Sequence, residues 1–473
     1  RDSELVKLTR VEFDRLVQSK PVIMNELNRL LVHRLQQVAT QSQGKLEPKT
    51  IALIPATSTS NVKLAQEKLT AALQADGVDF ATISHKDGMK SLDRLSALET
   101  SCDLVLFQGK SGETAWNAKC ARQADRILVI ANASDRPHSE LSIEILRKRA
   151  VHQLVDLILL QPDGITLPGK TTSWLDTFPV NRHFHIRNQP ADWQHLARIL
   201  TGRGLGVVFS GGGARAYAHI GALRAIAEMG LTIDFIGGTS MGAIVAACHA
   251  RGWSYEEIYQ RVHYSFVTSN PLSDYTLPLM SLVRGHKVER LLFENFGEAN
   301  IADLWTPFFC ASSNLTNGLV HIHKTDKLWK ALRASIALPG ILPPVPTKHG
   351  ILVDGGVLDN MPIDVMRGLH RGPVIAVDVA REQNMGTKWL ERENARPWYQ
   401  KAISPPIIAI LMRSGTVNGE ALSRKQAGRA DLIIEPPLGN IEIRQWKCFE
   451  ETIEIGYNET MTQLKENKSL FGL

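Results

Sequence analysis

Between residues 50 and 200, short apolar runs alternate with stretches whose apolar residues recur at helical spacing. Such runs indicate buried strands, and the stretches between them indicate helices. The expected strands are 51–54, 104–107, 127–130 and 157–160, and the expected helices are 61–76, 114–124 and 139–150. This alternation predicts a doubly wound, Rossmann-like α/β domain with a parallel sheet. No G-x-G-x-x-G follows the first strand, so we expect a scaffold or regulatory domain rather than a dinucleotide site.

A second alternation begins near Gly204 and predicts another α/β domain over residues 204–385, with a central, mostly parallel sheet. Its expected strands are 205–209, 233–236, 308–311, 319–322, 351–353 and 374–377, and its first helices are 214–229 and 241–250. We expect residues 386–473 to form a C-terminal extension packed on this domain. The apolar run 405–412 is short, and we expect it in a core rather than in a membrane.

Residues 1–45 form a short N-terminal stub. Their apolar pattern predicts a short strand followed by a helix over residues 22–37. A segment of this size cannot hold a core alone, so it must pack on something else or be a remnant. Ser42-Gln43-Gly44 fits a linker to the next domain. The sequence begins at Arg1 without methionine, which suggests a piece of a longer product.

Composition narrows the classes of protein that this chain can belong to. Its 473 residues predict two or three globular domains. The net charge of +6 is small for this length, and no basic run is interleaved with aromatic residues, so we expect no nucleic-acid partner. Attraction to anionic lipid head groups stays open. No apolar stretch reaches the roughly 18 residues of a membrane-spanning helix, so membrane contact would be peripheral.

The five cysteines are scattered along the chain and include no C-x-x-C pair: Cys102, Cys120, Cys248, Cys310 and Cys448. Their odd number and wide spacing favour free thiols in a reducing compartment, and therefore a cytoplasmic location. The same spacing argues against a cysteine-based zinc site.

Two glycine-framed segments each end an apolar run and begin a helical pattern. Gly238-Thr239-Ser240-Met241-Gly242 predicts a nucleophile elbow, a sharp strand-to-helix turn that exposes Ser240. Gly211-Gly212-Gly213-Ala214-Arg215 places consecutive backbone N–H groups at a predicted helix start, where a developing oxyanion is stabilised. The alternative for the triple glycine, a phosphate-binding loop, lacks the lysine of a P-loop. Arg215 could orient this loop or meet a phosphate head group.

A serine nucleophile needs a base, and the usual chain order of serine, acid and histidine fails here. His370 shortly precedes a strand and is expected at the opposite end of the sheet. Four other histidines fit structural roles better than that of a base: His219, His249, His321 and His323. Asp354, which precedes Gly355-Gly356, remains as the candidate base. Because ligands bind at the carboxyl edge of parallel strands, we expect Asp354 and Ser240 to meet there.

These segments resemble the patatin-like phospholipases. Four blocks of that family are matched in order: 211–215, 238–242, 334–339 and 354–356. Gly237–Ser240, Ala302–Trp305 and Val374–Val379 are similar to its neuropathy target esterase branch. The resemblance covers nearly the whole chain.

The resemblance implies a catalytic dyad of Ser240 and Asp354 without histidine, an oxyanion hole at Gly211, Gly212 and Gly213, and an acyl-enzyme intermediate. It implies phospholipid or lysophospholipid substrates and neither metal nor cofactor. Residues 1–8 resemble the tail of a cyclic-nucleotide-binding domain. The barrel of such a domain is absent from this sequence, so we expect no cyclic-nucleotide binding.

One position departs from the family pattern, which usually has glycine where this chain has Ala216. Alanine is tolerated there if the residue is helical, but it would be strained at a positive φ angle. Two alternatives follow: a catalytically inactive scaffold or regulatory member of the family, and a nucleotide-binding module.

Overall fold

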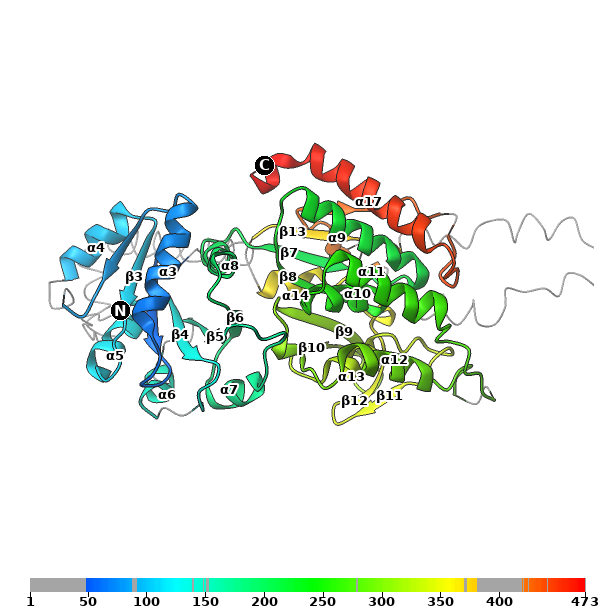
Figure 1. The fold of residues 1–473 in the computed structure, drawn as a ribbon, viewed down its shortest axis with the longest axis horizontal. Helices are drawn as coiled ribbons and strands as arrows, with labels where there is room; N and C mark the ends of the chain where they lie inside the picture. Colours follow the sequence, from blue (N-terminus) through cyan, green and yellow to red (C-terminus); the bar gives the residue numbers. More distant parts are fainter. Residues whose placement is uncertain are drawn as a thin grey trace, which may run out of the picture. The chain divides into compact units, whose positions relative to one another are not determined.

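The computed structural model describes residues 48–86, 92–137, 140–147, 149, 153–277, 280–369, 372–380, 419, 421–423, 425–439 and 441–472. The stub 1–45, the run 405–412 and His370 lie outside these residues. Contacts group the chain into two compact units (Figure 1). The first unit consists of the described residues up to Ile158 together with residues 177–182 and 200–202. The second unit consists of residues 159–176, residues 183–199 and the described residues from 203 onward.

The first sheet, counted over the described residues, has six strands in the order β2-β3-β1-β4-β5-β6. Its strands are β1 (Thr50–Pro55), β2 (Phe80–Ile83), β3 (Leu104–Gln108), β4 (Arg126–Asn132), β5 (Leu154–Leu160) and β6 (Arg182–Ile186). The helices between and after them are α3 (Val62–Ala75), α4 (Leu92–Ser101), α5 (Thr114–Gln123), α6 (Glu140–Arg147), α7 (Thr171–Thr177) and α8 (Pro190–Leu200).

The strand order of this sheet differs from the dinucleotide-binding type. There the second strand lies beside the first, whereas here β1 pairs in parallel with β3 and β4. The sequence pattern also missed β2 and β6. Both contain polar or part-exposed positions rather than a continuous apolar run.

The second sheet, over the described part of the chain, runs β11-β12-β9-β8-β7-β13-β14, with β10 added beside β9. Its strands are β7 (Leu205–Phe209), β8 (Ile233–Thr239), β9 (Phe308–Asn314), β10 (Leu319–His323), β11 (Val345–Thr347), β12 (Gly350–Asp354), β13 (Val374–Val377) and β14 (Leu432–Ile434). Its main helices are α9 (Ala218–Glu228), α10 (Ser240–Ala250), α11 (Tyr255–Val262), α12 (His286–Phe296), α13 (Leu328–Ser335), α14 (Ile363–Leu369) and α17 (Phe449–Glu466).

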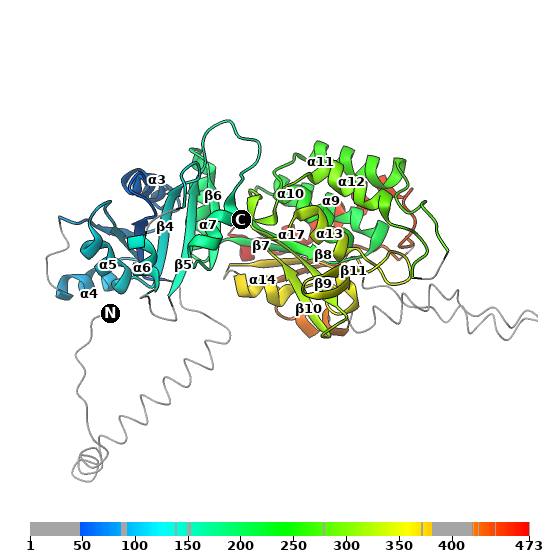
Figure 2. The same cartoon turned by 90° about the horizontal axis from the view of Figure 1, so that it is seen from below.

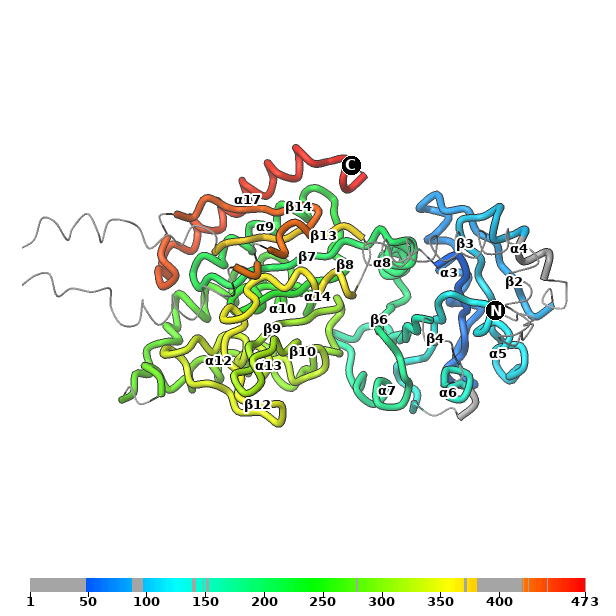
Figure 3. Tube along the Cα trace, turned by 180° about the vertical axis from the view of Figure 1, so that it is seen from behind, coloured from blue at the N-terminus to red at the C-terminus, as the bar shows by residue number. Residues whose placement is uncertain are grey.

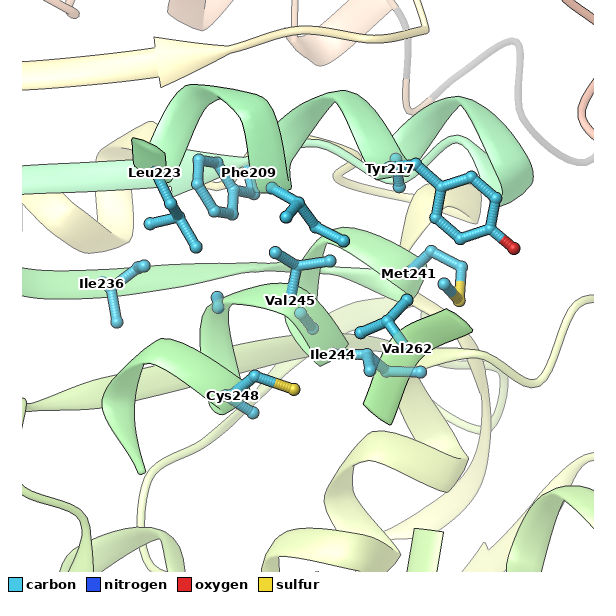
Figure 4. Close-up of a cluster of buried hydrophobic side chains, with 14 of the residues drawn as sticks. Phe209, Tyr217, Leu223, Ile236, Met241, Ile244, Val245, Cys248 and Val262 are labelled. Atoms are coloured by element: carbon cyan, nitrogen blue, oxygen red, sulfur yellow. The ribbon is translucent and has the colours of Figure 1, made fainter. Parts of the chain in front are cut away.

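Helices cover both faces of this second sheet. Figure 2 shows α10 and α11 on one face and α14 on the other. The core between β7, β8 and the covering helices is built from closely packed apolar side chains such as Phe209, Ile236 and Val245 (Figure 4). All three are fully buried, so the core fixes the ends of β7 and β8, where the candidate site residues follow.

The helix predicted at 214–229 begins differently in the structure. Gly213–Tyr217 forms a short 3₁₀ segment, and the α-helix starts only at Ala218. Ala216 lies inside this segment, fully buried, and is not among the described non-glycine residues with a positive φ angle. Alanine is therefore unstrained at the position where the family usually has glycine.

The C-terminal helix α17 packs tightly against α9, as Figures 1 and 3 both show. Glycines permit this close approach, because a methyl group on Gly456 would overlap the backbone of Ala218 and one on Gly221 would overlap the backbone of Ile453. Next to this contact, the ring of Tyr217 packs on that of Phe449 at 4.6 Å. The C-terminal helix α17 thus joins the second unit through a glycine-lined helix pair.

We expect Gly456→Ala to lower the free energy of unfolding by about 1–3 kcal/mol, the usual effect of overpacking a tight contact. The measurement is the midpoint of thermal or denaturant unfolding of the full chain. Gly368→Ala is the matched control. Gly368 is also helical, but it is exposed and no atom lies within 4 Å of the added methyl group, so alanine should be neutral or stabilising there. Equal midpoints for the two variants would contradict the tight helix contact.

Candidate active site

Ser240 lies at the junction of β8 and α10, as the elbow pattern predicted. Its φ angle is +55°, a value that non-glycine residues rarely adopt. The turn is sharp because the backbone of the neighbouring strand β7 approaches it closely: side chains at Gly238 or Gly242 would overlap the Phe209 and Ser210 carbonyls. The two flanking glycines therefore let β7 pack against the elbow, and the turn leaves the Ser240 side chain partly accessible.

The carboxylate of Asp354 accepts a hydrogen bond from the Ser240 hydroxyl, with 2.6 Å between Oγ and Oδ2. Its other oxygen, Oδ1, accepts from the Gly356 N–H at 2.8 Å. Asp354 is 3% exposed, so solvent reaches this carboxylate poorly. The structure thus brings together the two side chains that the sequence analysis selected.

The reason for this meeting differs from the predicted one, because β12 is antiparallel to β9 rather than part of a parallel array. β10 occupies one edge of β9 over residues 310–314. β8 and β12 must therefore both pair along the other edge of β9. β8 lies beside residues 308–311 of β9, and β12 lies beside residues 312–314. They approach from opposite directions, and their carboxyl ends meet end to end.

Burial raises the pKa of the Asp354 carboxyl to about 6, even though the hydrogen bonds from Ser240 and Gly356 favour its charged form. A carboxylate with a pKa nearer to neutrality is a stronger base than one in water. It is still mostly ionised at pH 7 and can therefore accept a proton.

Ser335 supports the elbow, a role that the sequence analysis did not assign. Its hydroxyl accepts a hydrogen bond from the Ser240 N–H at 2.9 Å and donates one to the Ala311 carbonyl at 2.7 Å. This fully buried side chain ties the start of α10 to β9. Ser335 belongs to the block 334–339, which resembles the family. The resemblance therefore identified this segment but did not indicate what Ser335 does.

The three glycines after β7 are not equivalent. The Gly211 N–H donates to Asn360 Oδ1 at 3.2 Å, and Asn360 Nδ2 donates back to the Gly211 carbonyl at 3.1 Å. The Gly211 N–H is therefore engaged by Asn360 in this conformation, and its part in an oxyanion hole stays a prediction. Among the described residues, the N–H groups of Gly212 and Gly213 have no hydrogen-bond partner. Both glycines line the candidate site, so their N–H groups are available to a ligand.

A cavity of about 130 Å³ connects these groups. Its polar lining includes Ser240, Asp354 and the glycine loop, while much of its wall is apolar, including Phe266, Pro271, Leu272, Val288, Ile336, Leu338, Ile341 and Leu342. Ile443, Arg444 and Trp446 also line it. The C-terminal extension thus forms part of the site, which the sequence pattern did not reveal.

Arg215 faces the C-terminal extension. It is 6% exposed, and its Nε donates to the Ile441 carbonyl at 2.6 Å. The Ala214 N–H donates to the Ile443 carbonyl beside it. Of the two roles left open for Arg215, the geometry fits the orientation of the glycine loop better than contact with a head group.

His219 and His249 lie in the helices that follow the glycine turns; His219 is fully buried and His249 is partly exposed. His219 stacks on Phe209 and bonds through Nε2 to the Ser210 carbonyl, and burial lowers the pKa of both His219 and His249 to about 4. Neither has a hydrogen bond to Ser240 among the described residues.

A second serine–histidine–aspartate arrangement lies on the other side of β9. His323 bonds to Ser312 Oγ at 3.0 Å through Nε2 and to Asp326 at 2.8 Å through Nδ1. Ser312 is fully buried and does not line the cavity. Ser312, His323 and Asp326 are therefore arranged as in a catalytic triad, but a substrate has no access to the Ser312 hydroxyl.

The carboxyl edge of the first sheet provides a poor site for phosphate. The loop after β1 meets the end of β4 there, and Asp135 accepts hydrogen bonds from the hydroxyls of Thr57 and Thr59. A carboxylate at this position would repel an anionic phosphate. This disfavours the alternative of a nucleotide-binding module.

A strand–turn–helix serine, a buried carboxylate and two unbonded amides beside an apolar cavity are the arrangement expected of a site with a serine nucleophile. A family model described as patatin-like phospholipase matches residues 207–367. Another, described as the Neuropathy Target Esterase family P-loop like domain, matches residues 47–199. Over these two ranges the chain therefore carries a patatin-like phospholipase domain and a domain like that of the neuropathy target esterase family.

Curated relatives match over almost the whole chain. Patatin-like phospholipase domain-containing protein 6 of Homo sapiens is 27% identical over 97% of this chain and 39% of that protein. Neuropathy target esterase sws of Drosophila melanogaster is 28% identical over 97% and 37%, and Lysophospholipase NTE1 of Pyricularia oryzae is 27% identical over 99% and 38%.

The chain spans about two fifths of the length of these relatives. Among solved structures, VipD from Legionella pneumophila matches with a TM-score of 0.33 and 14% identity, over 56% of this chain and 67% of that one. Among the helices of the described residues, none combines the length and apolar character needed to cross a membrane.

Proposed function

We propose that this protein hydrolyses acyl ester bonds of lysophospholipids or phospholipids, with Ser240 as nucleophile and Asp354 as base. The observation that carries the proposal is the 2.6 Å hydrogen bond between these side chains inside an apolar-walled cavity. The names of the relatives, which include lysophospholipase and patatin-like phospholipase, support the choice of a lipid ester.

The geometry supports an acyl-enzyme route. Asp354 takes the proton of the Ser240 hydroxyl as Oγ forms a bond to the acyl carbonyl carbon, and the carbonyl electron pair moves onto its oxygen. The N–H groups of Gly212 and Gly213 face this oxyanion; one such donor can contribute roughly 2.7–4 kcal/mol. Asp354 then returns the proton to the leaving alcohol as the ester C–O bond breaks.

The second half of the reaction reuses the same groups. Water attacks the acyl carbon and gives a proton to Asp354, and the bond between Ser240 Oγ and the acyl carbon breaks. Oγ recovers its proton from Asp354, and the fatty acid leaves. Each group returns to its starting state, as turnover requires.

A panel of lipid esters tests the proposed substrate class. We expect the full chain to release free fatty acid from lysophospholipid or phospholipid and to be labelled covalently by a fluorophosphonate probe. Absence of both turnover and labelling in the folded protein would instead support the inactive scaffold. The unpaired cysteines are consistent with the predicted reducing compartment for this activity.

An exposed loop at the cavity wall supports contact with a lipid surface. Pro271 and Leu272 line the cavity, and shortly after them Tyr275 pairs with Val283. Leu277 and Met280 on this loop are 80% and 75% exposed. Exposed apolar side chains beside an apolar-walled cavity fit insertion into a phospholipid surface.

We expect Leu277→Asp/Met280→Asp to reduce binding to phospholipid vesicles and hydrolysis of vesicle substrate at least about tenfold, because apolar burial in the bilayer is lost. Hydrolysis of a soluble short-chain ester should not change, since the dyad is untouched. Co-sedimentation measures vesicle binding, and hydrolysis assays on the vesicle substrate and on the soluble ester measure the difference in activity. Leu470→Asp, at a leucine 45% exposed and outside the cavity wall, is the control. Equal loss with both esters would contradict a role at the lipid surface.

A further inference from the structure

We propose that His321, His323 and Asp326 form a binding site for a divalent transition-metal ion of the zinc class, with His349 as a fourth ligand. The site lies outside the catalytic cavity, and the proposal is independent of the esterase activity.

The first support is the convergence of the donor atoms. His321 and His323 are two residues apart on β10 and therefore point to the same face of the sheet. Asp326 follows in the turn after the strand. One donor atom from each of the three lies within 4.8 Å of the others. Imidazole and carboxylate together are a donor set that Zn²⁺, Co²⁺ and Ni²⁺ accept.

His323 is already held as a metal ligand would be. Its Nε2 bonds to the buried Ser312 hydroxyl, which fixes the ring, and its Nδ1 points to Asp326 at 2.8 Å. Metal-binding histidines commonly use their second nitrogen for such a hydrogen bond. A metal ion would replace the proton now shared by Nδ1 and Asp326, so both groups would become ligands after a small adjustment.

His349 places a third imidazole beside the cluster from another segment, although its nitrogens lie outside the group of donor atoms that the other three residues form. It lies in the turn between β11 and β12, and its ring centre is 4.9 Å from that of His321. The rings of His321 and His323 are 4.6 Å apart. Among the described residues, the side chains of His321 and His349 have no hydrogen-bond partner, and Asp326 forms an ion pair with His323 alone. The cluster therefore has open donors and no competing lysine or arginine.

A bound ion would tie β10 to the hairpin that leads into Asp354. His321 pairs with Ser312 across one edge of β9, and Asp354 pairs with the same residue across the other edge. The ion would thus brace the strand that carries the candidate base without entering the cavity. Because it binds the folded state, it should raise the stability of this unit.

The test uses the full chain, free of any affinity tag and treated with chelator, and titrates it with Zn²⁺ and Co²⁺. We expect one ion per chain, a rise in the unfolding midpoint, and the d–d absorption of Co²⁺ bound by nitrogen and oxygen. His321→Ala and Asp326→Asn should each weaken binding by at least about tenfold, and His349→Ala by about tenfold. These positions are partly exposed, so the variants should fold.

His286→Ala is the matched control, since His286 is an exposed histidine on α12 outside the cluster and should leave affinity unchanged. No binding by the wild-type chain, or equal binding by wild type and His321→Ala, would overturn the site. Unchanged affinity in His349→Ala would overturn the assignment of the fourth ligand.

Discussion

Replacing Ser240 by alanine is expected to reduce ester hydrolysis by about 10⁴–10⁶-fold, the effect seen when a serine nucleophile is removed. Without Oγ no acyl-enzyme can form, so fluorophosphonate labelling should disappear as well. The fold should persist, because serine and alanine are equally strained at the φ angle of +55° and the Ser240 N–H keeps its bond to Ser335. Turnover of lysophospholipid, covalent labelling and the unfolding midpoint measure these effects.

Ser312→Ala is the matched control, because Ser312 also hydrogen-bonds within a histidine–aspartate arrangement. It is fully buried and outside the cavity, so the variant should keep its labelling and most of its turnover. If Ser240→Ala kept its activity and Ser312→Ala lost it, the nucleophile would be Ser312 and the proposed mechanism would be wrong.

Asp354→Asn is expected to lower kcat by about 10²–10⁴-fold, the usual contribution of a positioned acid–base group. An amide can hold the same position and accept from the Gly356 N–H, but it cannot take the Ser240 proton. The substitution therefore removes proton transfer and leaves the geometry of the site in place. If activity survived and a His219 or His249 substitution removed it, a histidine would be the base.

The pH dependence of the wild-type enzyme should report the same carboxylate. Only ionised Asp354 can accept the proton, and burial raises its pKa to about 6. We therefore expect kcat/KM to fall about tenfold for each pH unit well below that value. The residual activity of Asp354→Asn should not show this acid limb.

The stability of the folded protein should depend on pH in the opposite direction to its activity. A carboxyl group whose pKa is raised by folding binds its proton more tightly in the folded chain. Its contribution to stability is complete below the unfolded value of about 3.8 and is lost as the pH rises through about 6. Asp354→Asn removes a charge that is buried at neutral pH, so it should raise the free energy of unfolding at pH 7–8 by up to roughly 3 kcal/mol. A lower midpoint than that of the wild type at this pH would contradict burial as the cause.

The principal elements of both sheets could be predicted from the sequence because each leaves a local signature. β1, β3, β4 and β7 are short apolar runs, and burial on both faces requires that composition. β6 escaped prediction because histidine and arginine alternate with its apolar residues. The elbow at Ser240 was recognisable because its two glycines stand within two residues of the serine, although the carbonyls that require them belong to β7.

The direction of β12 could not be predicted from its own residues. An apolar run that ends in Asp354 has the same appearance in a parallel or an antiparallel strand, and only pairing with β9 decides between them. The role of Gly211 was likewise invisible, because its partner Asn360 lies 149 residues away in the sequence. The wall formed by Ile443 and Trp446 depends on the docking of α17 against α9.

The sequence by itself determined the class of fold and the chemically distinctive residues, since apolar periodicity and glycine turns act over short distances along the chain. Only the tertiary structure decided which of those residues meet. Two strands that end at the same edge of β9 bring Ser240 within hydrogen-bonding distance of a carboxylate 114 positions later. Contacts between residues so far apart depend on strand direction and helix packing, which no local pattern encodes.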